Sequence, residues 1–86
     1  MNKRRVYYVS FEWKGKETYD YVLAYTKAGA VSVLREYLDL PAKAIHGALL
    51  ATPLMVKNHH PEGSVMVFSH MYIPMDSPAV QQALEN

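Results

Sequence analysis

Four histidines have the widest chemical range of any side chains in this sequence, because imidazole can act as a general acid, a general base or a metal ligand near neutral pH. They are His46, His59, His60 and His70. His59 and His60 are adjacent, so a regular strand would point them to opposite faces, and only a loop could aim both at one ligand. Zinc sites use three or four ligands at recognisable spacings, which these histidines do not show. We therefore expect no metal site, and a mobile, solvated loop from His59 to Gly63.

The remaining reactive side chains form no recognisable catalytic arrangement. The chain has no cysteine, which excludes a thiol nucleophile, a thiolate metal site and a disulfide framework. None of the serines lies in the glycine-flanked turn between strand and helix that exposes a nucleophile, and the four glycines are too far apart to form a phosphate-binding loop. The acidic residues fall in expected turns, helix caps and helix faces. We therefore expect a protein that is not an enzyme and that carries no cofactor.

One segment resembles a family with catalytic chemistry. Residues 60–67, HPEGSVMV, followed by Ile73-Pro74 and a short closing helix, resemble the second half of small mRNA-interferase toxins of the HicA type. The resemblance implies a ribonuclease in which His59 or His60 acts as general base and acid towards an RNA 2′-hydroxyl, while Lys57 holds phosphate. It covers less than a third of the chain. The sequence departs from the family because it has no Gly-Ser-His motif and because a hairpin, not a helix, comes first.

A second resemblance concerns architecture. Residues 21–30, YVLAYTKAGA, have the pattern of a strand that leads directly into a capped helix. This pattern is similar to that of many small phage and plasmid proteins that block a host enzyme, including polymerase inhibitors and anti-CRISPR proteins. The resemblance implies an inhibitor that acts by binding.

Length and composition are typical of one small globular domain. The 86 residues, half of them hydrophobic and a fifth charged, predict a single domain over residues 1–86. No apolar run is long enough for a membrane span, and residues 1–5 lead into a strand-like segment without the apolar core of a signal peptide. We therefore expect a cytoplasmic protein that binds no membrane. The net charge is +1, but residues 1–16 carry +4 and residues 17–86 carry −3, so the basic residues gather at one end.

The first half of the chain alternates and then changes period. Apolar and polar residues alternate over Arg4–Trp13 and again over Thr18–Thr26, on either side of a turn at Lys14–Lys16, which predicts a β-hairpin. Both faces of this hairpin hold aromatic residues. Over Lys27–Leu38 the apolar residues recur every three or four positions, which predicts a helix capped by Thr26.

The segment 42–51 allows two interpretations, a short helix or a loop that leads into a strand. We favour a strand over about residues 45–56, because residues 54–56 and 65–68 are apolar and bracket a turn-like segment, as a second hairpin with a long loop would. Pro53 would then lie at a bulge or on the sheet edge.

The C-terminal segment completes the expected topology. Residues 64–73 alternate with apolar side chains on both faces, which predicts a strand covered on both sides. Ser77 and Pro78 then open a short helix. We therefore predict an α+β fold, ββαββα, in which two β-hairpins form one antiparallel sheet with two helices.

The aromatic and methionine content predicts a binding surface. Seven tyrosines and five methionines are many for 86 residues, and these types, with tryptophan and arginine, are enriched at interface cores. Two helices leave one face of two apolar hairpins short of cover, so we expect that face to bind a partner protein or a second copy of the chain. The residues expected at the contact are Tyr8, Trp13, Tyr19, Tyr21, Tyr37 and Tyr72, with Arg4, Arg5 and Lys16 at its rim. The predicted function is a non-enzymatic protein-binding module, either an inhibitor of a host protein or a homodimerising adaptor.

Single-stranded nucleic-acid binding is the alternative. On an exposed sheet, Tyr8 and Tyr21 would stack on bases while basic residues follow the phosphates. Those basic residues are Lys3, Arg4, Arg5, Lys14 and Lys16. A net charge of only +1 and the lack of a ribonucleoprotein motif favour the protein partner.

The expected hairpin also places its residues relative to one another. Residues at a similar distance from the turn lie opposite each other. We therefore expect Tyr8 to face residues 21–23, and Arg4, Arg5 and Lys16 to lie at the same end of the hairpin or along its edge.

Overall fold

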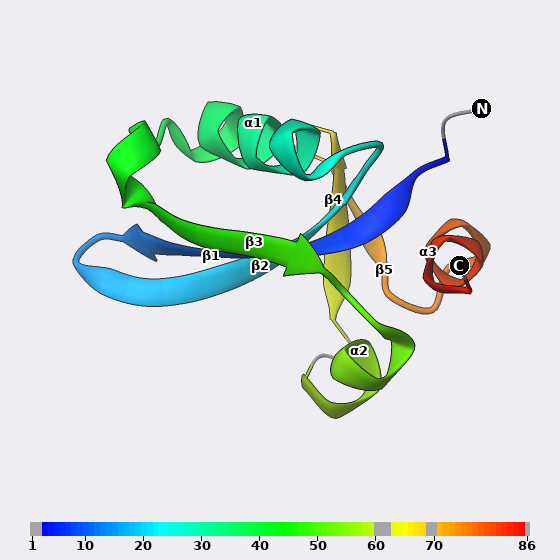
Figure 1. The fold of residues 1–86 in the computed structure, drawn as a ribbon. Coiled ribbons are helices and arrows are strands. Elements are labelled where there is room, and N and C mark those ends of the chain that lie inside the picture. The colour runs from blue at the N-terminus through cyan, green and yellow to red at the C-terminus, as the bar shows by residue number, and fades with distance from the viewer. Residues whose placement is uncertain (1–2, 60–62, 69–70, 86) are drawn as a thin grey trace.

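A long β-hairpin forms the centre of the sheet (Figure 1). β1 (Arg5–Trp13) and β2 (Lys16–Ala24) pair antiparallel over all nine residues of each strand. Lys14 and Gly15 close the turn with φ angles of 54° and 77°, the two positive values that a type I′ turn requires. A side chain at Gly15 would meet no atom within 4 Å, so the left-handed backbone rather than lack of space favours glycine there. The expected N-terminal hairpin is confirmed.

The structure is a computed structural model that describes residues 3–59, 63–68 and 71–85. In this part of the chain a five-stranded mixed sheet, with the strand order β3-β1-β2-β4-β5, packs against three α-helices. None of these helices has the length and apolar character that a membrane span needs. Besides β1 and β2, the elements are α1 (Lys27–Leu38), a 3₁₀ turn (Ala42–Ala44), β3 (Ile45–Leu50), α2 (Pro53–His59), β4 (Ser64–Phe68), β5 (Met71–Pro74) and α3 (Pro78–Leu84).

Local hydrogen bonds fix both ends of α1, which spans the residues expected from the period of the sequence. The Thr26 hydroxyl oxygen accepts a hydrogen bond from the Gly29 N–H at 2.9 Å and so caps the first turn. Asp39 ends the helix with a left-handed backbone, φ 54°. The Leu40 N–H then donates to the Arg35 carbonyl, and the Arg35 Nε donates to the Leu40 carbonyl, each at 3.0 Å.

The expected ββαββα order and the wholly antiparallel sheet are wrong, whereas a small single α+β domain is confirmed. The observed order is ββαβαββα, because residues 45–50 form β3, which pairs antiparallel with β1 at one edge of the sheet. The chain then crosses to the other side of the hairpin, where β4 runs parallel to β2 with Val22 opposite Met66. A parallel neighbour needs a long crossover connection, and here α1, β3 and α2 supply it.

The strand expected over residues 54–56 is instead the helix α2. Pro53 stands at its first position, where no backbone N–H is needed for a helical hydrogen bond. The Thr52 hydroxyl oxygen accepts from the Met55 N–H, and the Thr52 carbonyl accepts from the Val56 N–H, both at 3.1 Å. This Thr-Pro pair is the same kind of signal as the Ser-Pro pair that opens α3. The cap therefore overrides the short apolar run that suggested a strand.

The second hairpin is β4–β5, and it lies largely within residues 64–73, which the alternation predicted as one strand. Val65 of β4 lies opposite Ile73 of β5. The expected loop from His59 to Gly63 falls mostly on residues 60–62, which are outside the described residues.

Helices cover both faces of the sheet, and each face has its own core (Figure 1). The core between α1 and the sheet consists of Tyr7, Val9, Phe11, Val22, Ala24, Ala30, Leu34, Leu40 and Met66. The core between the sheet, α2 and α3 consists of Val6, Tyr21, Leu23, Ala51, Val56, Val65, Val67, Met75, Val80, Ala83 and Leu84. Alternate residues of β1 and β2 therefore serve opposite cores.

Replacing Leu34 tests the core beneath α1. Leu34 has no exposed surface, so Leu34→Ala removes buried methyl groups and leaves a cavity, which should lower the free energy of unfolding by about 2–5 kcal/mol. Leu54 on α2 is 67% exposed, and Leu54→Ala should change the free energy of unfolding by less than about 0.5 kcal/mol. Urea denaturation followed by circular dichroism measures both. Equal losses in the two variants would contradict this packing.

Candidate functional site

Three tyrosines of the central hairpin form one cluster. The rings of Tyr8 and Tyr19 stack, with centroids 5.2 Å apart and 24° between their planes. Tyr21 meets both rings edge-on, with centroids 5.6 Å from Tyr8 and 5.8 Å from Tyr19. Such aromatic pairs contribute about 0.5–1.5 kcal/mol each beyond the burial of their area. The cluster is therefore a preorganised aromatic surface.

The register of the sheet places this cluster on one face. Tyr8 lies opposite Tyr21 on β2, as expected, and opposite Leu49 on β3, while Tyr19 lies opposite Ser10. Opposed residues of an antiparallel pair point to the same face, so Leu49, which is 45% exposed, extends the aromatic surface toward the sheet edge. We call this surface the tyrosine face and define it by Tyr8, Ser10, Glu12, Glu17, Tyr19, Tyr21, His46 and Leu49.

The tyrosine face extends beyond the helices that cover the rest of its side of the sheet. Val6 of β1 is buried in the core with α2 and α3, whereas Tyr8, two residues on, is only partly buried against it. Tyr21 has no exposed surface, and Tyr19, two residues nearer the turn, is 37% exposed. Figure 1 shows the turn end of the hairpin projecting away from α2 and α3, with α1 on the opposite face. Aromatic surface is therefore open to solvent between the core and the turn.

Two carboxylates border the tyrosine face at its turn end. Glu12 and Glu17 lie directly opposite each other on β1 and β2, and both are exposed. Like charges in that position repel each other and destabilise the pair. His46 Nδ1 lies 3.7 Å from the Glu17 carboxylate, which offsets the repulsion only when the imidazole is protonated. The charge beside the exposed tyrosines is therefore negative at neutral pH.

Tyr21 supports the cluster from beneath, although it was expected at the contact itself. Burial raises the pKa of its phenol, and the neighbouring Tyr19 and Tyr8 raise it further. The phenol therefore stays neutral at physiological pH. A nucleic-acid base or a side chain of a partner protein can reach Tyr8 and Tyr19. Tyr21 is fully buried beneath these two rings and against the core, so neither can reach it.

Tyr37 and Tyr72 lie on the other face, beside α1, and so are separated from the tyrosine face by the sheet. Their rings meet edge-on with centroids 6.0 Å apart. The Tyr72 hydroxyl donates a hydrogen bond to Asp20 Oδ2 at 2.6 Å, and the Tyr21 N–H donates to Asp20 Oδ1 at 3.0 Å. Burial, the hydrogen bond to Asp20 and the nearby carboxylate charge raise the pKa of Tyr72 well above its usual value. These residues tie β5 and α1 to β2.

Trp13 stands at the tip of the hairpin, on the side of α1. Trp13 is 42% exposed, and Lys14 Nζ lies 4.7 Å from the centroid of its ring, which is a cation–π distance. Lys16 is opposite Trp13 in the register. A shallow cavity of about 380 Å³ separates the tip from the segment after α1, with Lys43 on its far side. The tip is therefore basic, in contrast to the acidic border of the tyrosine face.

The expectation that Arg4, Arg5 and Lys16 share one end of the hairpin is wrong. Arg5 pairs with Ala24 at the open end, whereas Lys16 pairs with Trp13 next to the turn. Eight residues of strand separate the two ends, about 26 Å at 3.3 Å per residue. The physical reason is that Arg5 begins β1 and Lys16 begins β2, and the first residues of two antiparallel strands lie at opposite ends of a hairpin.

Two of the four histidines lie on elements that the structure describes. His46 is on β3, and His59 is the last residue of α2. His60 and His70 lie outside the described residues. Across residues 3–59, 63–68 and 71–85 no three His, Asp or Glu side chains gather in a way that could hold a metal ion.

Comparison with protein families, with curated proteins and with solved structures finds no match to this chain.

The sequence analysis missed five members of the tyrosine face as contact residues: Ser10, Glu12, Glu17, His46 and Leu49. Leu49 is the apolar one among them. The sequence does contain a signal for an exposed apolar strand that includes Leu49. Residues 45–50, IHGALL, carry no Lys, Arg, Asp, Glu or Pro, the residues that usually protect an exposed strand edge. The side of the sheet to which Leu49 points depends on the pairing of β3 with β1, which is not local in sequence.

Tyr72→Phe tests the hydrogen bond to Asp20 through the alkaline pH dependence of stability. The pKa of Tyr72 is raised above the unfolded value of 10.0, so its contribution is full below that pH and is lost as the pH rises toward the folded pKa. We expect Tyr72→Phe to lower the free energy of unfolding at pH 7 by about 1 kcal/mol or less, and to make the loss above pH 10 shallower than in the wild type. Urea denaturation at pH 7, 9, 10 and 11 measures this. Parallel pH curves would contradict it.

Proposed function

We propose that this chain is a small non-enzymatic protein-binding module and that a partner protein docks on the tyrosine face. The observation that carries the proposal is the Tyr8–Tyr19 stack, which is partly exposed beside the exposed Leu49 on the open part of the sheet. Tyrosine supplies a large contact area at a small cost in conformational entropy, and the ring stack reduces that cost further. Exposed aromatic and apolar side chains distinguish this surface, rather than the convergent polar groups that catalysis uses.

The charges on the tyrosine face favour a basic partner over a nucleic acid. Glu12 and Glu17 repel each other, so an arginine or lysine placed between them would relieve that repulsion as it bound. The same cation would lie near the Tyr19 ring, where a cation–π contact adds to the attraction. Phosphate groups would instead meet two carboxylates. The lysines of the hairpin tip, Lys14 and Lys16, lie on the side of α1 and so offset these carboxylates only in part.

The edge of β3 supports self-association as a second property of the module. The Ala51 N–H donates to the Val6 carbonyl at 2.9 Å. Hydrogen-bonded pairs alternate along an antiparallel ladder, so the amide groups of Leu49 point to β1, and those of Ala48 and Leu50 point away from the sheet. An uncharged edge of this kind can pair antiparallel with the same edge of a second copy about a two-fold axis.

A double variant on the tyrosine face tests docking. Extracts of the source cells are passed over immobilised wild-type protein, over Tyr8→Ser/Tyr19→Ser and over Tyr25→Ser, which removes an exposed tyrosine at the other end of the sheet. We expect a partner that the wild type and Tyr25→Ser retain and that the double variant loses. With that partner purified, calorimetry should show at least about a 30-fold weaker affinity for the double variant, because central interface tyrosines often contribute about 2 kcal/mol or more.

Folding and salt serve as controls for this experiment. Circular dichroism must show that the double variant is folded at the assay temperature. A partner retained equally by all three proteins would contradict the proposal. Tight binding of single-stranded oligonucleotides that weakens steeply between 50 and 200 mM salt, and that the double variant loses, would replace it with the nucleic-acid alternative.

Leu50→Lys tests self-association at β3. Leu50 is 40% exposed on the edge strand, and a lysine there places two like charges close together in a β3–β3 pair. Sedimentation velocity should show a concentration-dependent dimer for the wild type. For Leu50→Lys the dissociation constant of the dimer should be at least about tenfold higher. Leu54→Lys changes a leucine on α2, off the edge, and should behave as the wild type. A wild type that sediments only as a 9.8 kDa monomer at 100 μM would overturn the dimer, though not docking on the tyrosine face.

A further inference from the structure

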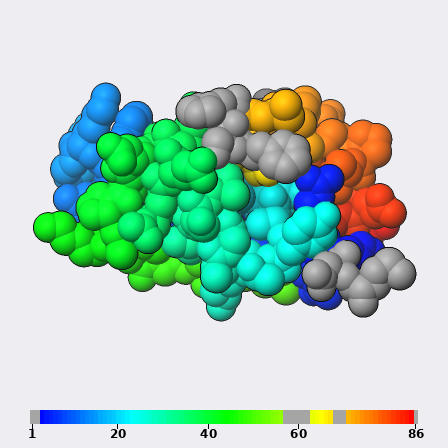
Figure 2. Space-filling view, turned by 90° about the horizontal axis from the view of Figure 1, so that it is seen from above, coloured from blue at the N-terminus to red at the C-terminus, as the bar shows by residue number. Residues whose placement is uncertain are grey.

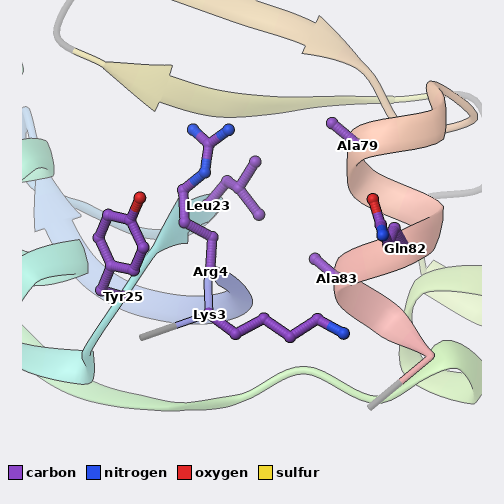
Figure 3. A pocket seen from close by; sticks show the side chains of 7 residues that line it. All are labelled: Lys3, Arg4, Leu23, Tyr25, Ala79, Gln82 and Ala83. Carbon is purple, nitrogen blue, oxygen red and sulfur yellow. The ribbon is translucent and has the colours of Figure 1, made fainter. Parts of the chain in front are cut away.

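A groove lies at the open end of the hairpin, far from the tyrosine face. Two adjoining cavities of about 250 and 490 Å³ make it up, and Arg4, Leu23 and Tyr25 line both. Figure 3 shows Arg4 and Tyr25 side by side, with α3 and its Gln82 forming the facing wall of the smaller cavity. Seen from the side of α1, the first residues of β1 reach the surface between the start of α1 and α3 (Figure 2).

The larger cavity has an apolar floor. Leu23 and Ala24 end β2, Val67 belongs to β4, and Val33 comes from α1. A cavity of about 490 Å³ lies within the range of small-molecule sites, about 300–1,000 Å³, which are mostly apolar with a few polar groups that orient the ligand. The floor can therefore take an apolar group of the size of a naphthalene ring or a medium-length acyl chain.

The charged side chains that line this groove are cationic. Arg4 borders both cavities, Lys3 borders the smaller one, and no Asp or Glu is among the described residues that line either. The larger cavity also reaches Thr26, which caps α1, and Gly29 in its first turn, where the helix dipole adds positive potential. An apolar molecule with a negatively charged group therefore matches the groove in both shape and charge.

We propose that this groove binds a small amphiphilic anion, an apolar molecule that carries one carboxylate or sulfonate group. Its apolar part lies on Leu23, Val33 and Val67, and its anionic group lies at the guanidinium of Arg4, which can form two parallel hydrogen bonds to a carboxylate. Lys3 strengthens the attraction from the rim. The site is distinct from the proposed protein-binding surface and stands without it.

Two fluorescent probes of the same shape test the site. 8-Anilino-1-naphthalenesulfonate carries one negative charge, and N-phenyl-1-naphthylamine is its neutral counterpart. We expect saturable binding of the sulfonate to the folded wild type, and about tenfold weaker binding to Arg4→Gln, which keeps hydrogen-bonding capacity but loses the charge. Binding of the neutral probe should change less than about twofold. Decanoate, below the concentration at which it forms micelles, should displace the sulfonate.

Matched variants separate this site from other surfaces. Lys16→Gln removes a cation at the opposite end of the hairpin and should leave sulfonate binding unchanged, as should Tyr8→Ser/Tyr19→Ser. Val33→Phe, checked for folding by circular dichroism, fills the floor and should weaken both probes. The proposal is overturned if Arg4→Gln binds the sulfonate as the wild type does, or if the tyrosine variant abolishes binding. It is also overturned if the protein sediments with phosphatidylglycerol vesicles while decanoate displaces no probe, because a bilayer surface would then be the ligand.

Discussion

The structure depends on the pairing of β1 with β2, two strands that are apolar on both faces. Val6 and Tyr21 point into one core, and Val9 and Val22 point into the other. A hairpin of this composition is unstable as an isolated two-stranded unit, because each face must be removed from water. The rest of the chain therefore supplies cover on both sides, α1 on one and α2 with α3 on the other.

The limited length of the helices on one side of the sheet explains why the tyrosine face is exposed. The two nine-residue strands are longer than the short helices α2 and α3 can cover, so the part of the hairpin near its turn extends past them. On the side of α1 the twelve-residue helix and the segment after it reach further along the hairpin. The stacked tyrosines are thus exposed on the face that α2 and α3 leave open, and stacking of Tyr8 on Tyr19 limits how much of their surface water reaches.

Elements whose signals lie within a few residues could be predicted from the sequence. The pairing of distant strands could not be predicted in this way. The helix Lys27–Leu38 was predictable from its helical period and its Thr26 cap, which are local in sequence. The first hairpin was predictable from the alternation of its strands and from the turn at Lys14 and Gly15. The Thr52-Pro53 cap is equally local, but the prediction followed the apolar residues after it and placed Pro53 in a strand. By contrast, the parallel contact of Val22 with Met66 joins residues 44 positions apart, and no period in the sequence specifies it. The tyrosines of the site were predictable as a group, but their division between two faces required the register of β1, β2, β3 and β5.

The hairpin also holds Arg4 far from the two glutamates of the tyrosine face. Arg4 lies at the open end beside an apolar groove, and Glu12 and Glu17 lie about eight residues along, on the tyrosine face. At about 3.3 Å per residue this distance exceeds the 8 Å screening length of physiological salt, so each end presents its own potential to a ligand. A basic partner of the proposed docking surface would therefore not be repelled by Arg4, and an anion in the proposed groove would not meet the glutamates. The two proposed sites thus lie too far apart to interact through their charges, so occupation of one should leave the affinity of the other unchanged unless the hairpin itself bends.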